Sequence, residues 1–232
     1  MATSTAIQME PEARCSLCGG SCFIPGPLGR SAGSGLPPKC ATCNSLERHR
    51  VVRQVYNAIP DSILGDARAL QFSDDPASPK ERFKSVEISL FGRDNSLDMT
   101  EIDRDDASYD WVIANHVLEH VHDDYLAIRE LLRIVTEDGV IQLTVPTPST
   151  ALETWELPEP DPDSFDHWRG YGSDLPLRLA GELKDCFGLQ VVCRDEPTQG
   201  WDVVYLFTKS RQTMLTIGKA LLKAGLPTLR SG

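Results

Sequence analysis

The chain has 232 residues, of which 41% are apolar and 25% charged, so it allows one sizeable globular domain and a small module. No stretch approaches the ~20 apolar residues of a membrane helix, and the N-terminus lacks the apolar segment of a signal peptide. We therefore expect no membrane span and a cytoplasmic protein. The net charge is −11, and residues 1–50 hold only three of the 34 acidic residues. The strongly acidic remainder argues against nucleic acid as a partner.

Two cysteine pairs near the N-terminus, each with two residues between its members, predict a zinc site formed by Cys15, Cys18, Cys40 and Cys43. Segment 25–38 between the pairs is too rich in Gly, Pro and Ser to build a core, so a metal would supply the missing stability. The alternatives are unligated thiols or a disulfide. With four thiolate ligands the zinc would be structural, since no coordination position stays open for catalysis.

A helix is predicted over residues 44–59, directly after the last of these cysteines, with Asn44 or Ser45 as its cap. Its apolar positions fall on one side. The charged residues 47–49 either pack on the cysteine module or edge a ligand cleft, and packing is the favoured interpretation.

The main domain is predicted to begin with strands at 67–72 and 83–89. The loop SDDPAS at 73–78 is typical of a capped turn into a helix. Glu87 falls at or near the carboxyl end of the second strand, where an acidic side chain can accept hydrogen bonds from both ribose hydroxyls of a nucleoside. A solvated carboxylate is the alternative.

A strand–helix–strand unit follows. Residues 111–114 are an unbroken apolar run, which is typical of a strand buried on both faces of a parallel sheet. Asn115 and His116 come next, at the edge where open α/β sheets bind ligands. The chain then continues with a helix, a Gly turn and a second apolar strand, at 128–135, 138–139 and 140–145.

His116 and His120 are four residues apart, with Glu119 between them, in a pattern similar to the inverted zinc-protease motif. A metal site needs a third ligand, and the segment directly follows a buried strand in a chain without other protease-like context, so this interpretation is disfavoured. His120 is instead a candidate general base or substrate contact, because its pKa lies near neutrality. A histidine that only ties down its loop is the alternative.

The segment 166–174, DHWRGYGSD, follows a long loop rich in proline and acids. His167, Arg169 and Tyr171 bring a base, a cation for anion binding and a hydroxyl together beyond the last parallel strand. Alternatively, the segment is the entry to a helix predicted over 174–187 and capped by Ser173.

Two final strands are predicted at 189–193 and 201–208, and the short connection between them favours antiparallel neighbours. An amphipathic tail follows at 211–226. It can cover the sheet, form a homodimer or touch a membrane surface, although two lysines are few for a membrane contact.

The main part of the chain, residues 66–208, resembles class I S-adenosylmethionine-dependent methyltransferases of the type 11 kind. The matching pieces are Tyr109-Asp110, HVLEHV at 116–121, the acidic pair 123–124, RELLRIV at 129–135 and LTVP at 143–146. The second cysteine pair followed by SLERHR, together with DHWRGYGSD, resembles a bacterial group of these enzymes that carries an N-terminal zinc ribbon with four cysteine ligands.

This resemblance implies a doubly wound, mostly parallel, seven-stranded α/β sheet of Rossmann type behind a small zinc ribbon. The implied contacts of S-adenosylmethionine are Phe72, Ser73, Asp75, Glu87, Asp98, Met99, Asn115 and His116. Catalytic roles are expected for His120 and His167, and acceptor contacts for Arg169 and Tyr171. The loop at 73–78 departs from the family pattern because it lacks the usual glycines.

We therefore expect a zinc ribbon at 1–44, a methyltransferase domain at 45–210 and a tail at 211–232. The expected activity is methyl transfer from S-adenosylmethionine to a small-molecule or saccharide acceptor. The alternative is a non-catalytic methyltransferase-like module that binds a protein partner through its zinc ribbon. An RNA-modifying enzyme is a weaker third option, because the body of the chain is acidic.

Overall fold

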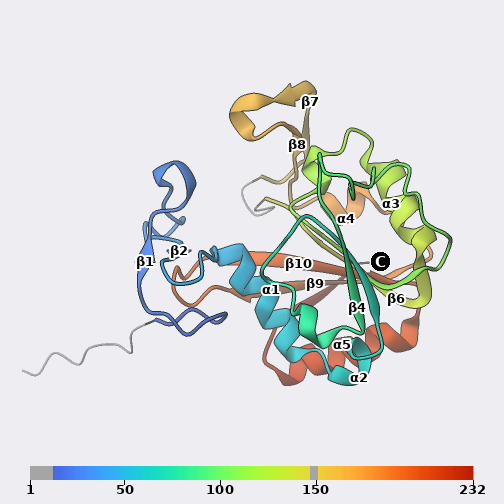
Figure 1. The fold of residues 1–232 in the computed structure, drawn as a ribbon, viewed down its shortest axis with the longest axis horizontal. Helices are drawn as coiled ribbons and strands as arrows, with labels where there is room; N and C mark the ends of the chain where they lie inside the picture. The colour runs from blue at the N-terminus through green and yellow to red at the C-terminus, as the bar shows by residue number, and fades with distance from the viewer. Residues whose placement is uncertain (1–12, 147–150, 232) are drawn as a thin grey trace, which may run out of the picture.

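A seven-stranded sheet forms the centre of the computed structural model, which describes residues 13–146 and 151–231 (Figure 1). β10 and β11 run antiparallel to their neighbours, and the other strands share one direction. The prediction of a mostly parallel α/β sheet is thus confirmed. In sheet order the strands are β11 (Thr228–Ser231), β9 (Phe187–Arg194), β10 (Trp201–Thr208), β6 (Val135–Thr144), β5 (Tyr109–Asn115), β3 (Arg68–Phe72) and β4 (Ser85–Ser89).

Helices cover both faces of this sheet. One core contains Trp111 of β5 and side chains of α1, α2 and α5, and the other contains Val112 and side chains of α3 and α4. Successive side chains of a strand point to opposite faces, so a strand covered on both sides needs a continuous apolar run. This is why β5 shows no alternation. The helices are α1 (Glu47–Ala58), α2 (Asp61–Leu64), α3 (Asp124–Ile134), α4 (Leu175–Arg178) and α5 (Arg211–Lys223).

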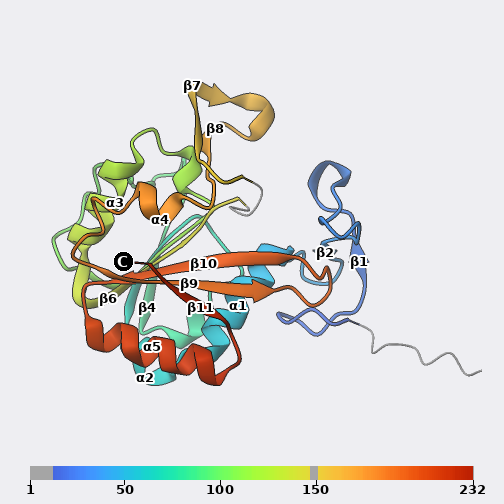
Figure 2. The same cartoon turned by 180° about the vertical axis from the view of Figure 1, so that it is seen from behind.

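The C-terminal tail completes the main sheet (Figure 2). Met214, Ile217 and Leu221 of α5 are buried in the same core as α1, and β11 pairs antiparallel with β9. Ser210 caps α5 by accepting a hydrogen bond from the backbone N–H of Thr213. Of the three arrangements considered for the tail, the structure shows the one that covers the sheet.

Two predicted helix boundaries were wrong. The helix expected over 174–187 ends at Arg178, and Phe187 instead begins β9, where it pairs with Thr208 of β10. Pairing with β10 therefore accounts for Phe187, whereas residues 179–186 form turns. The N-cap of α1 is Leu46, because the hydroxyl of Ser45 contacts the sulfurs of two cysteines instead.

Gly139 has a different role from the one predicted. The helix α3 passes directly into β6 at Val135, and Gly139 lies inside β6, where the register with β5 shifts. A Cβ atom at this position would lie 3.0 Å from the backbone oxygen of Asp110 and 2.6 Å from a methyl carbon of Val135. Gly139 therefore permits a close approach of two strands rather than ending the helix.

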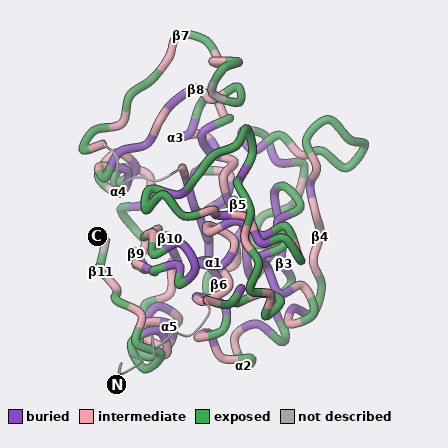
Figure 3. The backbone as a smooth tube through the Cα atoms, turned by 90° about the vertical axis from the view of Figure 1, so that its left-hand side faces the viewer, coloured by how far each residue is buried: buried purple, intermediate pink, exposed green. Residues whose placement is uncertain are grey.

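Two small sheets stand outside the main one. The cysteine module contains β1 (Phe23–Ile24) and β2 (Lys39–Cys40), and a hairpin after β6 contains β7 (Trp155–Asp161) and β8 (His167–Gly170). The outer part of this hairpin is largely exposed (Figure 3). Short 3-10 helices occur at Pro27–Gly29, Lys80–Arg82, Leu118–His120 and Pro162–Ser164. None of the helices in the described ranges is long and apolar enough to cross a membrane.

Candidate functional site

The order of the strands places a topological switch point between β3 and β5, and we call the region outside the carboxyl ends of these two strands the crevice. After β3 the chain runs to β4 on one side, whereas after β5 it runs to β6 on the opposite side, so the connections that follow the two strands lead in opposite directions. Ligands of open α/β sheets bind at such a point, outside the carboxyl ends of the strands. Ser73 after β3 and His116 after β5 both adopt left-handed backbone conformations, with φ of 69° and 53°. Such strain in residues other than glycine is concentrated at functional sites.

A chain of buried polar side chains bridges the two sides of this crevice. The carboxylate of Asp75 accepts hydrogen bonds from the side-chain amide of Asn115 at 2.8 Å and from the backbone N–H of Ala77 at 2.6 Å. The amide oxygen of Asn115 accepts in turn from Gln142 at 3.0 Å and from Thr144 at 3.4 Å. These contacts hold the loop after β3 in place although it contains no glycine.

Replacing Asn115 with alanine is expected to lower the free energy of unfolding by about 1–3 kcal/mol. The reason is that Asp75 and Gln142 would each lose a buried partner. Urea denaturation monitored by circular dichroism measures this loss. Asn57→Ala is the matched control, because Asn57 is exposed on α1, and a change within about 0.5 kcal/mol is expected. Equal effects of both variants would contradict the bridging role.

The first turn of α1 lies beside the crevice. Burial lowers the pKa of His49 to about 4, with Asp75 opposing the shift and Arg48 and His116 adding to it, so these charges lie within electrostatic reach of one another. Glu47 forms a 2.6 Å ion pair with Arg30 of the cysteine module. Glu47 therefore packs on the cysteine module, as favoured, and a place for His49 at the edge of a ligand cleft stays a prediction.

Two other expected cofactor residues, Glu87 and Asp98, lie in different surroundings. Glu87 lies two residues before the carboxyl end of β4, and its carboxylate binds Arg104 and the hydroxyl of Tyr109. The hydrogen bond from Arg104 keeps the pKa of Glu87 below its usual value. Asp98 is exposed, accepts hydrogen bonds from Thr100 and lies in the segment between β4 and β5.

Phe72 and Met99 supply apolar surface on the same side of the sheet, because both are buried in the core that packs against α3. The residues that the structure brings together at the crevice are Phe72, Ser73, Asp75, Asn115 and His116. Glu87 stands apart from them. Their contacts with a cofactor stay predictions.

His120 and His167 come from distant parts of the chain and face each other. The short helix Leu118–His120 contacts β8, and the two imidazole rings lie 4.7 Å apart between centroids. The carboxylate of Glu119 lies beside them, and potential ligand atoms of the three residues all fall within 4.8 Å of one another. Burial lowers the pKa of His167 below its ordinary value, which keeps its imidazole neutral near pH 7.

Arg169 and Tyr171 are buried and bond to the protein itself, which differs from the free cation and hydroxyl that the sequence predicted. Arg169 donates to the backbone oxygens of Val121 and His122, each at 2.5 Å. Tyr171 donates its hydroxyl to Asp124 at 2.9 Å. These contacts hold β8 against the loop that carries His120, so both residues position the site. A direct contact of either with an acceptor stays a prediction.

The four predicted zinc ligands form a compact cluster. The sulfurs of Cys15 and Cys43 are 3.7 Å apart, those of Cys18 and Cys40 are 3.6 Å apart, and all four lie within 4.8 Å of one another. A tetrahedral zinc with Zn–S bonds of ~2.3 Å needs sulfurs about 3.8 Å apart, so the donor set fits this ion. The disulfide alternative is not seen, because all these cysteines are free.

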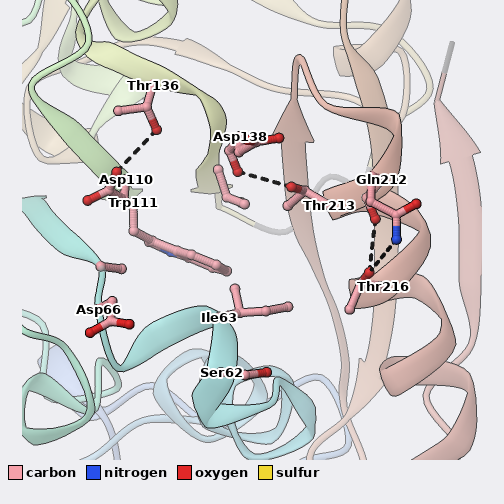
Figure 4. A pocket seen from close by; sticks show the side chains of 12 residues that line it. Ser62, Ile63, Asp66, Asp110, Trp111, Thr136, Asp138, Gln212, Thr213 and Thr216 are labelled. Atoms are coloured by element: carbon pink, nitrogen blue, oxygen red, sulfur yellow. Dashed lines mark hydrogen bonds between the residues drawn. The ribbon is translucent and has the colours of Figure 1, made fainter.

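Two surface cavities accompany these sites. One of about 350 Å³ lies near the amino-terminal part of β5, lined by Asp110, Trp111 and Thr213 among others, and none of the predicted site residues lines it (Figure 4). The second, of about 340 Å³, is lined by His122, Trp168 and Arg169, next to the histidine pair. The second cavity therefore has the better position for an acceptor.

Comparison with known families adds independent evidence. Residues 81–143, from the segment before β4 into β6, match the family described as methyltransferase domain. The prediction of a methyltransferase enzyme is thus confirmed for this part of the chain. Among curated proteins, none matches the sequence.

Several solved structures have a similar chain path at low identity. A 1,6-didemethyltoxoflavin-N1-methyltransferase of Burkholderia thailandensis is 15% identical, with a TM-score of 0.46, over 66% of this chain and 76% of that one. A phosphoethanolamine N-methyltransferase of Haemonchus contortus is 12% identical, with a TM-score of 0.47, over 75% and 47%. A possible histamine N-methyltransferase of Thermotoga maritima is 12% identical, with a TM-score of 0.41, over 70% and 92%.

Proposed function

We propose that the chain transfers the methyl group of S-adenosylmethionine to a small-molecule or saccharide acceptor. The observation that carries this proposal is the crevice between β3 and β5, where Ser73 and His116 adopt left-handed conformations at the ends of adjacent strands. His116 also has a buried Nε2 atom without a hydrogen-bond partner among the described residues, which suits a polar ligand. The methyltransferase domain match covers the strand that leads to His116.

The cofactor would supply an electrophilic methyl group, and the crevice residues would hold it. The carboxylate of Asp75 and the exposed carboxylate of Asp98 offer acceptors for its amino groups, and Phe72 offers apolar surface. His120 and His167 would contact the acceptor and accept its proton. Their positions beside the cavity that Trp168 and Arg169 line support an acceptor site there.

Zinc-replete protein is expected to bind S-adenosylmethionine and S-adenosylhomocysteine in the micromolar range, on the order of −8 kcal/mol. Asp98→Ala is expected to weaken binding about tenfold, because one charge-assisted hydrogen bond contributes about 1.5–3 kcal/mol. Isothermal titration calorimetry measures both. Asp105→Ala is the control, since Asp105 is an exposed acid of the same segment, and it should leave affinity unchanged.

Absence of binding by well-folded wild-type protein would overturn this proposal. The chain would then be better explained as a methyltransferase-like module that binds a protein partner through its cysteine module. The loop after β3 is the observation that favours this second function, because it lacks glycine and its Asp75 is already bonded to Asn115.

We further propose that Cys15, Cys18, Cys40 and Cys43 hold a structural zinc ion. The fit of their sulfurs to a tetrahedron supports this role. Free cysteines are typical of a reducing compartment, which supports a cytoplasmic location.

A further inference from the structure

Glu119 carries a buried carboxylate that the protein leaves partly unsatisfied. Its side chain is 1% exposed, and its Oε2 atom has no hydrogen-bond partner within the described part of the chain. The other oxygen lies 3.5 Å from Nδ1 of His116. A buried carboxylate is costly unless it is paired or coordinates a metal, so this oxygen indicates a missing cationic partner.

Two imidazoles stand beside that carboxylate. Ligand atoms of Glu119, His120 and His167 lie within 4.8 Å of one another, and the two rings meet edge to face. Ligands at about 2.1 Å from one ion lie roughly 3–3.5 Å apart, so modest side-chain rotations would close this set around a metal. His120 is exposed and free to make such a rotation. Strand β8 thus supplies His167 as a ligand beside Glu119 and His120 of the HxxEH pattern, in place of His116.

We propose that Glu119, His120 and His167 bind a divalent transition-metal ion, separately from the cysteine cluster. Two imidazole nitrogens and one carboxylate are a donor set that such ions take while keeping coordination positions open. The open coordination positions of the metal would lie on the solvent-exposed side of His120 and would bind an oxygen atom of a small molecule.

If the proposed metal site is present, the methyl acceptor is expected to be a compound with a hydroxyl group. With the metal bound, His120 and His167 would serve as its ligands and no longer as bases. The metal-bound hydroxyl of the acceptor has a strongly lowered pKa, so it would release its proton to solvent near neutral pH and present an oxygen anion beside the crevice. This assignment of the acceptor rests on the proposed methyltransferase function, whereas the metal site itself does not.

Arg169 would keep the proposed metal ligands in position relative to one another. Its guanidinium donates to the backbone oxygens of Val121 and His122 on one side of the site, while the residue itself lies two positions after His167 on β8. The two segments that carry the ligands are therefore fastened to each other before a metal arrives, which reduces the cost of assembling the site.

Titration of the full chain with Co²⁺, followed by visible absorption and by metal analysis after dialysis, tests the proposal. Thiolate-bound cobalt gives intense charge-transfer bands, whereas a site of nitrogen and oxygen ligands gives only weak visible bands. Wild-type protein is expected to bind a second equivalent without additional thiolate bands. Glu119→Gln, His120→Ala and His167→Ala should each weaken that equivalent at least tenfold, since even outer partners of metal ligands cost 10–100-fold.

His122→Ala is the matched control, because His122 is an exposed histidine of the same segment whose ring meets that of Trp168 edge to face. It should keep both equivalents. A single equivalent in wild-type protein, or a second one that survives in Glu119→Gln and His167→Ala alike, would overturn the metal site. Calorimetry with S-adenosylhomocysteine on the same variants separates this outcome from failure of the proposed function, since cofactor affinity should not depend on this metal.

Discussion

Replacing Cys40 with serine is expected to release the zinc and unfold residues 13–45. Cys40 is fully buried on β2, and its sulfur lies 3.6 Å from that of Cys18. The segment between the cysteine pairs has little core of its own, so the proposed zinc ion, whose binding contributes about 10–16 kcal/mol in small zinc modules, would supply its folding free energy. Metal analysis and limited proteolysis measure the effect, and removal of zinc by a chelator should reproduce it.

Cys22→Ser provides the control for this prediction. Cys22 is exposed and lies outside the cluster, so the variant should keep its zinc and its resistance to protease. Full zinc content in Cys40→Ser would contradict the proposed ligand set.

Replacing Arg50 with methionine is expected to cost about 3–5 kcal/mol of stability. Arg50 is completely buried, donates two hydrogen bonds to Asp195 at 2.7 and 2.8 Å, and donates others to the backbone oxygens of Ser45 and Pro38. The guanidinium thus joins the cysteine module to the loop after β9. Removing it leaves the buried carboxylate of Asp195 with no opposite charge. Chemical denaturation measures the loss, provided that the dependence of the unfolding free energy on denaturant concentration is the same in both proteins.

The exposed ion pair between Arg129 and Glu182 provides the comparison. Arg129 is half exposed in this pair, so Arg129→Met should change stability by less than about 1 kcal/mol. The double variant Arg50→Met/Asp195→Leu should recover part of the loss, because no buried charge then remains unpaired. If Arg50→Met lowered stability as little as Arg129→Met does, Arg50 would not be what fastens the cysteine module to the loop after β9.

The sheet was predictable because its signals are local. The apolar run of β5, the polar residues that follow it and the second apolar strand are each visible within a few residues. The short α4 was not predictable, since the pairing partner that draws Phe187 into β9 is Thr208, in a different part of the sequence. A local sequence pattern does not show whether a distant strand will pair with a segment that could also be helical.

The candidate site was predictable in its residue types and less so in its contacts. His120 and His167 were both expected, but their approach depends on the β7–β8 hairpin folding back onto Leu118–His120. The unsatisfied carboxylate of Glu119 and the internal bonding of Arg169 depend on burial, which a sequence pattern does not give. The HxxEH pattern was the one available signal for Glu119.

The position of β10 has a consequence for the synthesis of the chain. β10 lies between β6 and β9 in the sheet, yet it follows both in the sequence, so the ribosome makes an interior strand late. Until it emerges, the edge of β6 offers unpaired backbone groups along an apolar strand, which is a template for aggregation. Nascent chains that end before Trp201 should therefore depend on chaperones far more than the finished protein does.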